Sequence, residues 1–312
     1  MGRVHPVLRL IAERQETGKR DDGHRLALAI EGGSSRGTYS SGMVMAIDEL
    51  GLLSCFDDVY GSSAGALNGA WLVCGRASTG MASWWDPSVM RRVINPWHPL
   101  RGRPVVDTNY LVHKVYDGLQ PMDFPAILAS PIPFRPLATD ADTGESTDLH
   151  PFISDSVTLQ LALQATACIP LLAGRPVRLG GRRFVDAGIA EPLPFHTALK
   201  QGATHVLVLR TRRADEAPLR PPRMQDMLVP GILRRHAPGT LDLWRTTYER
   251  DLADERQLAE NEALFTVRPA AGSPDVGSLE RDPSVLRKAV DLGRAAVHTA
   301  LAEVTAFGRR HR

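Results

Sequence analysis

The residues with the clearest chemical potential are a serine and the glycines that flank it. Gly61-Ser62-Ser63-Ala64-Gly65 reads G-x-S-x-G between a short strand ending at Tyr60 and an apolar helical segment. This is the setting of a nucleophile elbow, a sharp strand-to-helix turn that strains a serine and exposes its hydroxyl at a sheet edge. Side chains two residues before and after the apex would collide, which favours Gly61 and Gly65. Ser63 is therefore the predicted nucleophile.

An earlier glycine-rich loop supplies candidates for holding a developing oxyanion. Gly32-Gly33-Ser34-Ser35-Arg36-Gly37 follows one strand and opens a helix, so its amide N–H groups can converge on one point. The candidates are Gly32, Gly33 and Ser34. The helix that begins near Ala64 also directs its positive amino end at the serine.

An aspartate is the candidate base. Asp186 ends a short apolar strand and precedes Ala187 and Gly188, so a loop there could return its carboxylate to the sheet edge. A turn aspartate that caps the next segment is the other interpretation of an isolated Asp-x-Gly. Because both motifs end strands, we expect Ser63 and Asp186 to meet at the carboxyl ends of the strands, within about 3 Å.

In this order, the motifs resemble those of the patatin-like phospholipases. That family pairs a loop of type G-G-G-x-R-G with a G-x-S-x-G elbow and a later D-G-G or D-G-A. The surroundings at residues 138–140, 143–145, 165–170 and 192–194 match as well, and the resemblance covers roughly residues 25–210. The matching motif positions are Gly32, Gly33, Arg36, Gly37, Gly61, Ser63, Gly65 and Asp186.

The resemblance implies a lipid acyl hydrolase with a Ser–Asp dyad. Ser63 would attack an ester carbonyl, Asp186 would take its proton directly, and the amides of Gly33 and Ser34 would hold the oxyanion. Water would then release the acyl group. Partial burial would help by raising the pKa of Asp186 above its usual value of about 3.9. Arg36 and Gly37 would support the loop, with Arg36 hydrogen-bonding nearby carbonyls.

Two departures from the family pattern leave alternatives open. Ser34 replaces the third loop glycine, and Ala187 follows the aspartate. Both could alter loop geometry, so one alternative is a catalytically silent patatin-fold module that binds lipid or a protein. The other is an α/β-hydrolase esterase with a Ser–Asp–His triad, which needs a histidine after the acid. His196 and His205 are closest to Asp186 in sequence, but no histidine stands out.

Alternating strand and helix patterns predict the scaffold that must position these residues. We expect an α/β fold, a three-layer α/β/α sandwich around a central, mostly parallel sheet. Residues 1–24 would form a charged lead-in with a short helix at 7–13, and residues 25–312 one hydrolase domain. A Trp- and Arg-rich helical insertion is expected at about residues 76–125. Further strands are expected at 134–140, 183–185, 205–210 and 263–268, and helices at 156–167, 241–252 and 290–304.

The amino-acid composition argues against several classes of protein. Lys and Arg number 37 against 35 Asp and Glu, which argues against a general nucleic-acid binder. The three cysteines lie in apolar segments and indicate thiols of a reducing compartment. We expect no signal peptide, because the first residues lack a long apolar core. No run approaches the roughly 18 apolar residues of a membrane span. The expected location is the cytoplasm, with no metal or cofactor.

Clustered arginines predict a basic rim. Arginines 91, 92, 101 and 103 surround Trp97, and Arg234 and Arg235 follow an apolar helical stretch at residues 228–233. A basic rim beside exposed apolar side chains would let the enzyme touch an anionic membrane and draw out an acyl lipid. Solvated surface arginines are the other interpretation. The tryptophans at 84, 85 and 97 are expected either in the core of the insertion or along an acyl pocket or a mobile cover.

Overall fold

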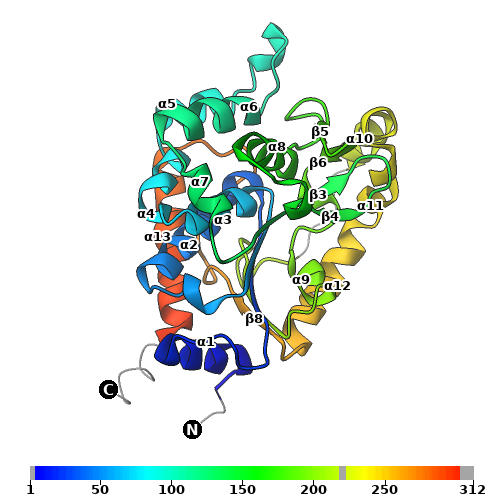
Figure 1. The fold of residues 1–312 in the computed structure, drawn as a ribbon. Coiled ribbons are helices and arrows are strands. Elements are labelled where there is room, and N and C mark those ends of the chain that lie inside the picture. Colours follow the sequence, from blue (N-terminus) through cyan, green and yellow to red (C-terminus); the bar gives the residue numbers. More distant parts are fainter. Residues whose placement is uncertain (1–3, 218–222, 303–312) are drawn as a thin grey trace.

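The computed structural model describes residues 4–217 and 223–302 and is built around one sheet of eight strands (Figure 1). The strands run in the order β5-β6-β3-β2-β1-β7-β8, and β4 pairs with β3. Neighbours from β3 through β8 along this path are parallel, whereas β4, β5 and β6 pair antiparallel. The strands are β1 Leu26–Ile30, β2 Asp58–Ser62, β3 Phe134–Asp140, β4 Ser146–Asp148, β5 Val177–Leu179, β6 Arg182–Val185, β7 His205–Leu209 and β8 Leu264–Val267.

Helices cover both faces of this sheet, which confirms the predicted three-layer arrangement. The longer ones are α1 Pro6–Thr17, α2 Gly37–Glu49, α3 Ala64–Val73, α8 Ser156–Thr166, α10 Arg223–His236, α12 Thr247–Glu260 and α13 Pro283–Ala300. The shorter helices and turns are η1 Ser34–Arg36, η2 Leu53–Cys55, α4 Ala77–Gly80, η3 Met81–Trp84, α5 Pro87–Val93, η4 His98–Arg101, α6 Thr108–Tyr110, η5 Leu111–Leu119, α7 Phe124–Leu128, η6 His150–Phe152, η7 Ala187–Ile189, α9 Phe195–Lys200, η8 Pro238–Thr240 and α11 Leu241–Arg245.

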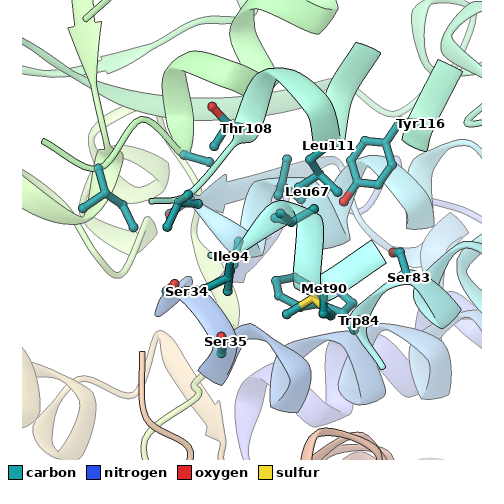
Figure 2. A pocket seen from close by; sticks show the side chains of 16 residues that line it. Ser34, Ser35, Leu67, Ser83, Trp84, Met90, Ile94, Thr108, Leu111 and Tyr116 are labelled. Atoms are coloured by element: carbon teal, nitrogen blue, oxygen red, sulfur yellow. The ribbon is translucent and has the colours of Figure 1, made fainter. Parts of the chain in front are cut away.

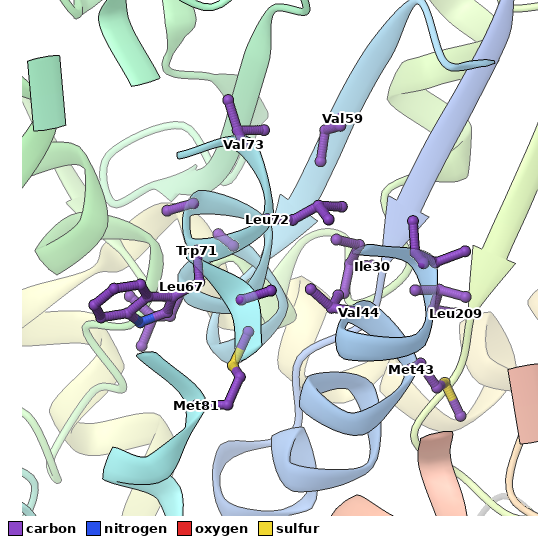
Figure 3. Close-up of a cluster of buried hydrophobic side chains, with 14 of the residues drawn as sticks. Ile30, Met43, Val44, Val59, Leu67, Trp71, Leu72, Val73, Met81 and Leu209 are labelled. Carbon is purple, nitrogen blue, oxygen red and sulfur yellow. The ribbon is translucent and has the colours of Figure 1, made fainter. Parts of the chain in front are cut away.

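The residues of β1 show how the two faces are separated. Leu26, Leu28 and Ile30 point into the larger core cluster, with side chains of α1, α2, α3 and α13. Figure 3 shows the part of this cluster in which Ile30 lies among side chains of α2 and α3. Ala27 and Ala29 point the other way and pack with α9 and α12. Successive side chains of a strand face opposite sides, so a run of five apolar residues fits a strand that is buried on both faces.

The segment before β1 is packed into this core. Helix α1 is longer than predicted and buries Val7, Leu8 and Ile11 in the same cluster as the sheet. Arg14 on this helix is also buried, and its guanidinium pairs with Asp22 and Asp57, both at 2.7 Å. The buried arginine thereby has the ionic partners that burial of a charge requires.

Three elements differ from the sequence prediction. The helix predicted over 241–252 breaks at Thr246 into α11 and α12, and the buried side chains of α12 are Asp251, Asp254 and Leu258. Strand β5 was not predicted. Within the helical insertion expected at about residues 76–125, residues 111–119 form the π-helix η5, and Leu119 at its end is exposed. Residue 304 of the predicted last helix lies outside the described residues.

All three cysteines are free and buried, as expected: Cys55, Cys74 and Cys168. Among the described residues, no helix is both long and apolar enough to cross a membrane.

Candidate active site

The G-x-S-x-G segment forms a strained turn between β2 and α3. Ser63 has φ 54° and ψ −126°, a conformation that costs energy in a residue with a Cβ and persists only where the surroundings hold it. Two hydrogen bonds hold it: the Ser63 amide donates to Thr166 Oγ1 at 2.9 Å, and the Ser62 hydroxyl donates to the Glu191 carbonyl at 2.7 Å. The apex residue is Ser63, as predicted.

The two elbow glycines are required because backbone packs directly against them. A Cβ on Gly61 would lie 2.4 Å from the Ala66 Cα, and one on Gly65 would lie 2.2 Å from the Ile30 carbonyl oxygen. Real Cβ atoms do not approach backbone this closely. A side chain at Gly61 would thus collide with α3, and one at Gly65 with the end of β1. Because these contacts are so close, the serine turn packs beside the glycine-rich loop that follows β1.

The Ser63 hydroxyl donates a hydrogen bond to Asp186 Oδ2 at 2.6 Å, which confirms the expected proximity. The second carboxylate oxygen, Oδ1, accepts from the Gly188 amide at 2.8 Å. Asp186 is only 7% exposed, and this burial raises its pKa to about 6, against the opposing effects of the Ser63 and Gly188 hydrogen bonds. Loss of solvation disfavours the charged carboxylate, so Asp186 binds a proton more strongly than an exposed aspartate does.

The sheet register explains why these residues converge. Ile30 at the end of β1 pairs with Gly61 of β2 and Leu209 of β7, so the loops after all three strands leave the same edge. Asp186 arrives differently from the prediction, because β6 runs antiparallel to β3. Val185 pairs with Thr139, whose hydroxyl donates to the Asp186 carbonyl at 2.8 Å. Asp186 thus approaches from the opposite direction and stops beside the elbow.

The glycine-rich loop leaves three amides free among the residues that the structure describes. Gly33 and Ser34 have φ values of 119° and 55°, so the serine that replaces the third family glycine adopts the left-handed conformation that a glycine would favour. Within the described residues, the amides of Gly32, Gly33 and Ser34 have no hydrogen-bond acceptor. The same loop lines the cavities at Ser63, which places its backbone beside the candidate nucleophile.

Arg36 does not act as the sequence suggested. Its expected hydrogen bonds to carbonyls are absent from the described part of the chain, and its Nε is buried without a partner. It acts instead on Glu31, which is buried beside Arg210 and Thr211. Burial tends to raise the pKa of Glu31, but Arg210, Arg36 and the Thr211 amide outweigh it and lower the pKa. Glu31 therefore stays ionised and ties the loop to the end of β7.

Two cavities open at Ser63, and they differ in chemistry. The smaller, of about 50 Å³, is almost wholly apolar and lies between α3, α5 and η5 (Figure 2). The larger, of about 440 Å³, has a more polar wall. Ser34, Ser63 and Ile169 border both. The apolar cavity includes Leu67, Trp84, Met90, Ile94, Leu111 and Tyr116, and the polar one Glu31, Arg36, Asp186, Arg212, Trp244 and Asp251.

The sequence around this site matches a known protein family. The family model described as patatin-like phospholipase matches residues 28–199, more than half of the chain. The chain belongs to the patatin-like phospholipase family. The matched range contains the glycine-rich loop, the elbow and Asp186.

This patatin-like protein is similar to curated proteins at 26–27% identity. An uncharacterized protein of Escherichia coli (strain K12), YjjU, is 26% identical over 199 residues, which are 60% of this chain and 52% of YjjU. An uncharacterized NTE family protein of Mycobacterium tuberculosis (strain ATCC 25618 / H37Rv) is 27% identical over 199 residues, 63% of this chain and 51% of its own. The chain thus spans about half the length of the curated relatives it matches.

Solved structures similar to the patatin-like chain include VipD from Legionella pneumophila, with a TM-score of 0.45 and 12% identity. That match covers 90% of this chain and 67% of VipD. Human GIVD cytosolic phospholipase A2 gives a TM-score of 0.42 and 11% identity, covering 98% of this chain and 64% of that chain.

The histidines that the structure describes lie elsewhere. Among residues 4–217 and 223–302, no histidine lines either cavity at Ser63. His196 Nε2 lies 2.7 Å from Asp254, and His298 lies beside Glu49. In the described ranges no cluster of three or more His, Cys, Asp or Glu side chains could hold a metal ion.

Three residues that shape this site are not predicted by the sequence motifs. Thr166 accepts from the Ser63 amide, and Thr139 fixes the Asp186 backbone. Thr166 shares a helical register with Leu159, Ala162 and Leu163, so a polar residue in an otherwise apolar stripe was the available signal. Arg212 in the larger cavity had no such signal, because it sits in a charged loop after β7. Of the tryptophans expected in the core or along an acyl pocket, Trp84 lines the apolar cavity, whereas Trp97 is exposed.

Proposed function

We propose that this protein is a serine hydrolase that cleaves carboxylic ester bonds of phospholipids through an acyl-enzyme. The observation that carries the proposal is the 2.6 Å hydrogen bond from Ser63 Oγ to a buried Asp186 whose pKa lies at about 6. An aspartate with that pKa is ionised at neutral pH yet is a stronger base than an exposed one. A serine needs such an adjacent base to act as a nucleophile.

In the proposed reaction Ser63 Oγ attacks the ester carbonyl carbon while its proton passes to Asp186. The carbonyl oxygen becomes an oxyanion, which the free amides of Gly32, Gly33 and Ser34 would bind. As the C–O bond breaks, Asp186 returns the proton to the leaving alcohol. Water then attacks the acyl-enzyme with Asp186 again as base, releasing the fatty acid and restoring the serine hydroxyl.

The two cavities suggest how an acyl lipid would lie. The apolar cavity suits the first part of an acyl chain, and the polar cavity suits the alcohol side of the ester. Arg36 and Arg212 line the polar cavity, and Arg36 Nε and two nitrogens of Arg212 are buried without acceptors among the described residues. Guanidinium groups bind phosphate oxygens strongly, which favours a phospholipid over a neutral glyceride.

Labelling with a fluorophosphonate, followed by a lipid panel, tests this function. We expect one adduct per chain, on the peptide that contains Ser63, and faster fatty-acid release from phosphatidylglycerol and phosphatidylcholine than from triacylglycerol. Absence of an adduct on folded protein would refute the nucleophile. An adduct combined with a preference for triacylglycerol would retain the hydrolase and reject the phospholipid.

Arg212→Gln should selectively slow phospholipid hydrolysis. Hydrogen bonds to charged groups are worth about 1.5–3 kcal/mol, so kcat/KM on phosphatidylglycerol should fall about tenfold or more. The rate on a short uncharged ester should change much less, because that substrate has no phosphate. Arg76→Gln is the matched control: Arg76 also pairs with an aspartate, Asp123 at 3.1 Å, but lines neither cavity. An equal loss on both esters would contradict the phosphate contact.

A further inference from the structure

The segment between α5 and α6 carries the two most exposed large apolar side chains of the described residues. Leu100 is 81% exposed and Trp97 is 73% exposed. Both belong to residues 95–105, here called the anchor loop, which projects from the body of the protein in Figure 1. A tryptophan and a leucine at the tip of a projecting loop cost solubility unless something covers them.

The anchor loop is held together from within. Ile94 and Val106 form an antiparallel bridge at its base, and the Asn95 amide donates to the Val105 carbonyl at 2.8 Å. The His98 ring is buried inside the loop, with Nδ1 3.1 Å from the Pro104 carbonyl oxygen. The exposure of Trp97 and Leu100 is thus imposed by a folded turn, with the interior position taken by His98.

The charge around the anchor loop indicates which surface would cover it. Residues 91–106 contain four arginines and no acidic residue. Arg103 pairs with Asp107 at 2.7 Å, whereas Arg101 has no ionic partner among the described residues. Tryptophan favours the boundary between lipid headgroups and acyl chains, and arginines near the surface attract anionic headgroups. A projecting tip with both features suits an anionic bilayer.

The base of the anchor loop is part of the candidate active site. Ile94 and Val106 line the apolar cavity, and the Val106 amide donates to the Leu172 carbonyl at 2.8 Å. Leu172 in turn lines the polar cavity. We propose that the anchor loop inserts Trp97 and Leu100 into the interface of an anionic bilayer and so holds the mouth of the acyl cavity against the membrane. This inference rests on the proposed phospholipase function and names the part of the chain that contacts the lipid.

Vesicle sedimentation with matched variants tests the anchor loop. Trp97→Ala/Leu100→Ala should bind vesicles of equal parts phosphatidylglycerol and phosphatidylcholine about tenfold or more weakly than the parent, because it loses two apolar insertions. Leu119→Ala/Val157→Ala is the control, since both side chains are 63% exposed but lie outside the loop. It should bind like the parent. Arg101→Gln should weaken binding about fivefold, and salt should weaken it further.

Hydrolysis of a short soluble ester separates this proposal from the proposed function. The Trp97→Ala/Leu100→Ala variant should keep that hydrolysis while losing hydrolysis of vesicle phospholipid. Unchanged vesicle binding in this variant, equal binding to pure phosphatidylcholine, or no binding by the parent protein would overturn the anchor. So would self-association of the parent that the double substitution abolishes, because a second copy would then cover the loop. Failure of soluble-ester hydrolysis in the parent would reject the catalytic proposal alone.

Discussion

Ser63→Ala and Asp186→Asn are each expected to reduce ester hydrolysis by at least about 10³-fold, the scale seen when a nucleophile or its base is removed from a serine hydrolase. Alanine leaves no oxygen to attack the carbonyl. Asparagine preserves the shape of the acid and its contact with the Gly188 amide, but it cannot take a proton. The measurement is kcat/KM on a short soluble ester, with circular dichroism and thermal unfolding to verify the fold.

Neighbouring residues provide matched controls for the dyad. Ser62→Ala removes the adjacent hydroxyl, which helps to hold the turn through its 2.7 Å hydrogen bond to the Glu191 carbonyl but is not the attacking group. It should lose far less activity than Ser63→Ala. His196→Gln tests the triad alternative, since His196 already pairs with Asp254. A folded His196→Gln or His205→Gln variant as inactive as Asp186→Asn would move the base from aspartate to histidine.

The elbow and its scaffold were predictable from sequence because their signals are local. Glycines at positions 61 and 65 are forced by backbone contacts within a few residues or with the adjacent strand. A run such as Leu26–Ile30 must be buried on both faces, which already implies helices above and below a parallel sheet. The order of strand, loop and helix then fixes which strand ends share an edge. These constraints gave the fold class, the nucleophile and the glycine-rich loop.

The rest of the site depends on contacts between distant segments. Whether β6 runs parallel or antiparallel to β3 decides how Asp186 reaches Ser63, and nothing in residues 182–188 encodes the direction. The ionised Glu31 is stable only because Arg210 and Thr211, almost 180 residues away, end the neighbouring strand. The buried face of α12 likewise carries Asp251 and Asp254, whereas the hydrophobic pattern of the sequence would place two aspartates on the solvent-exposed face. Their partners, among them Arg212, come from other elements.

The pH profile should show an acid limb controlled by Asp186. Hydrolysis requires the ionised carboxylate, and burial raises its pKa to about 6. The kcat/KM on a soluble ester should therefore be constant above neutral pH and fall about tenfold per pH unit below about 6. An exposed aspartate, with a pKa of about 3.9, would give no limb in this range. The measurement is a kcat/KM profile from pH 4.5 to 8.5 in buffers of constant ionic strength, with folding monitored at every pH.

The raised pKa of Asp186 also predicts how the free energy of unfolding depends on pH. Folding raises the pKa of the Asp186 carboxyl from 3.8 to about 6. The resulting contribution to the stability of the native state is fully present below pH 3.8 and is lost as the pH rises through about 6. A shift from 3.8 to about 6 corresponds to roughly 3 kcal/mol at neutral pH. Asp186→Asn removes this buried charge, so the variant should exceed the parent in unfolding free energy at pH 8 by up to that amount, with the difference shrinking toward pH 4. A difference that does not vary with pH would mean that Asp186 titrates like an exposed carboxylate, and the acid limb would then need another group.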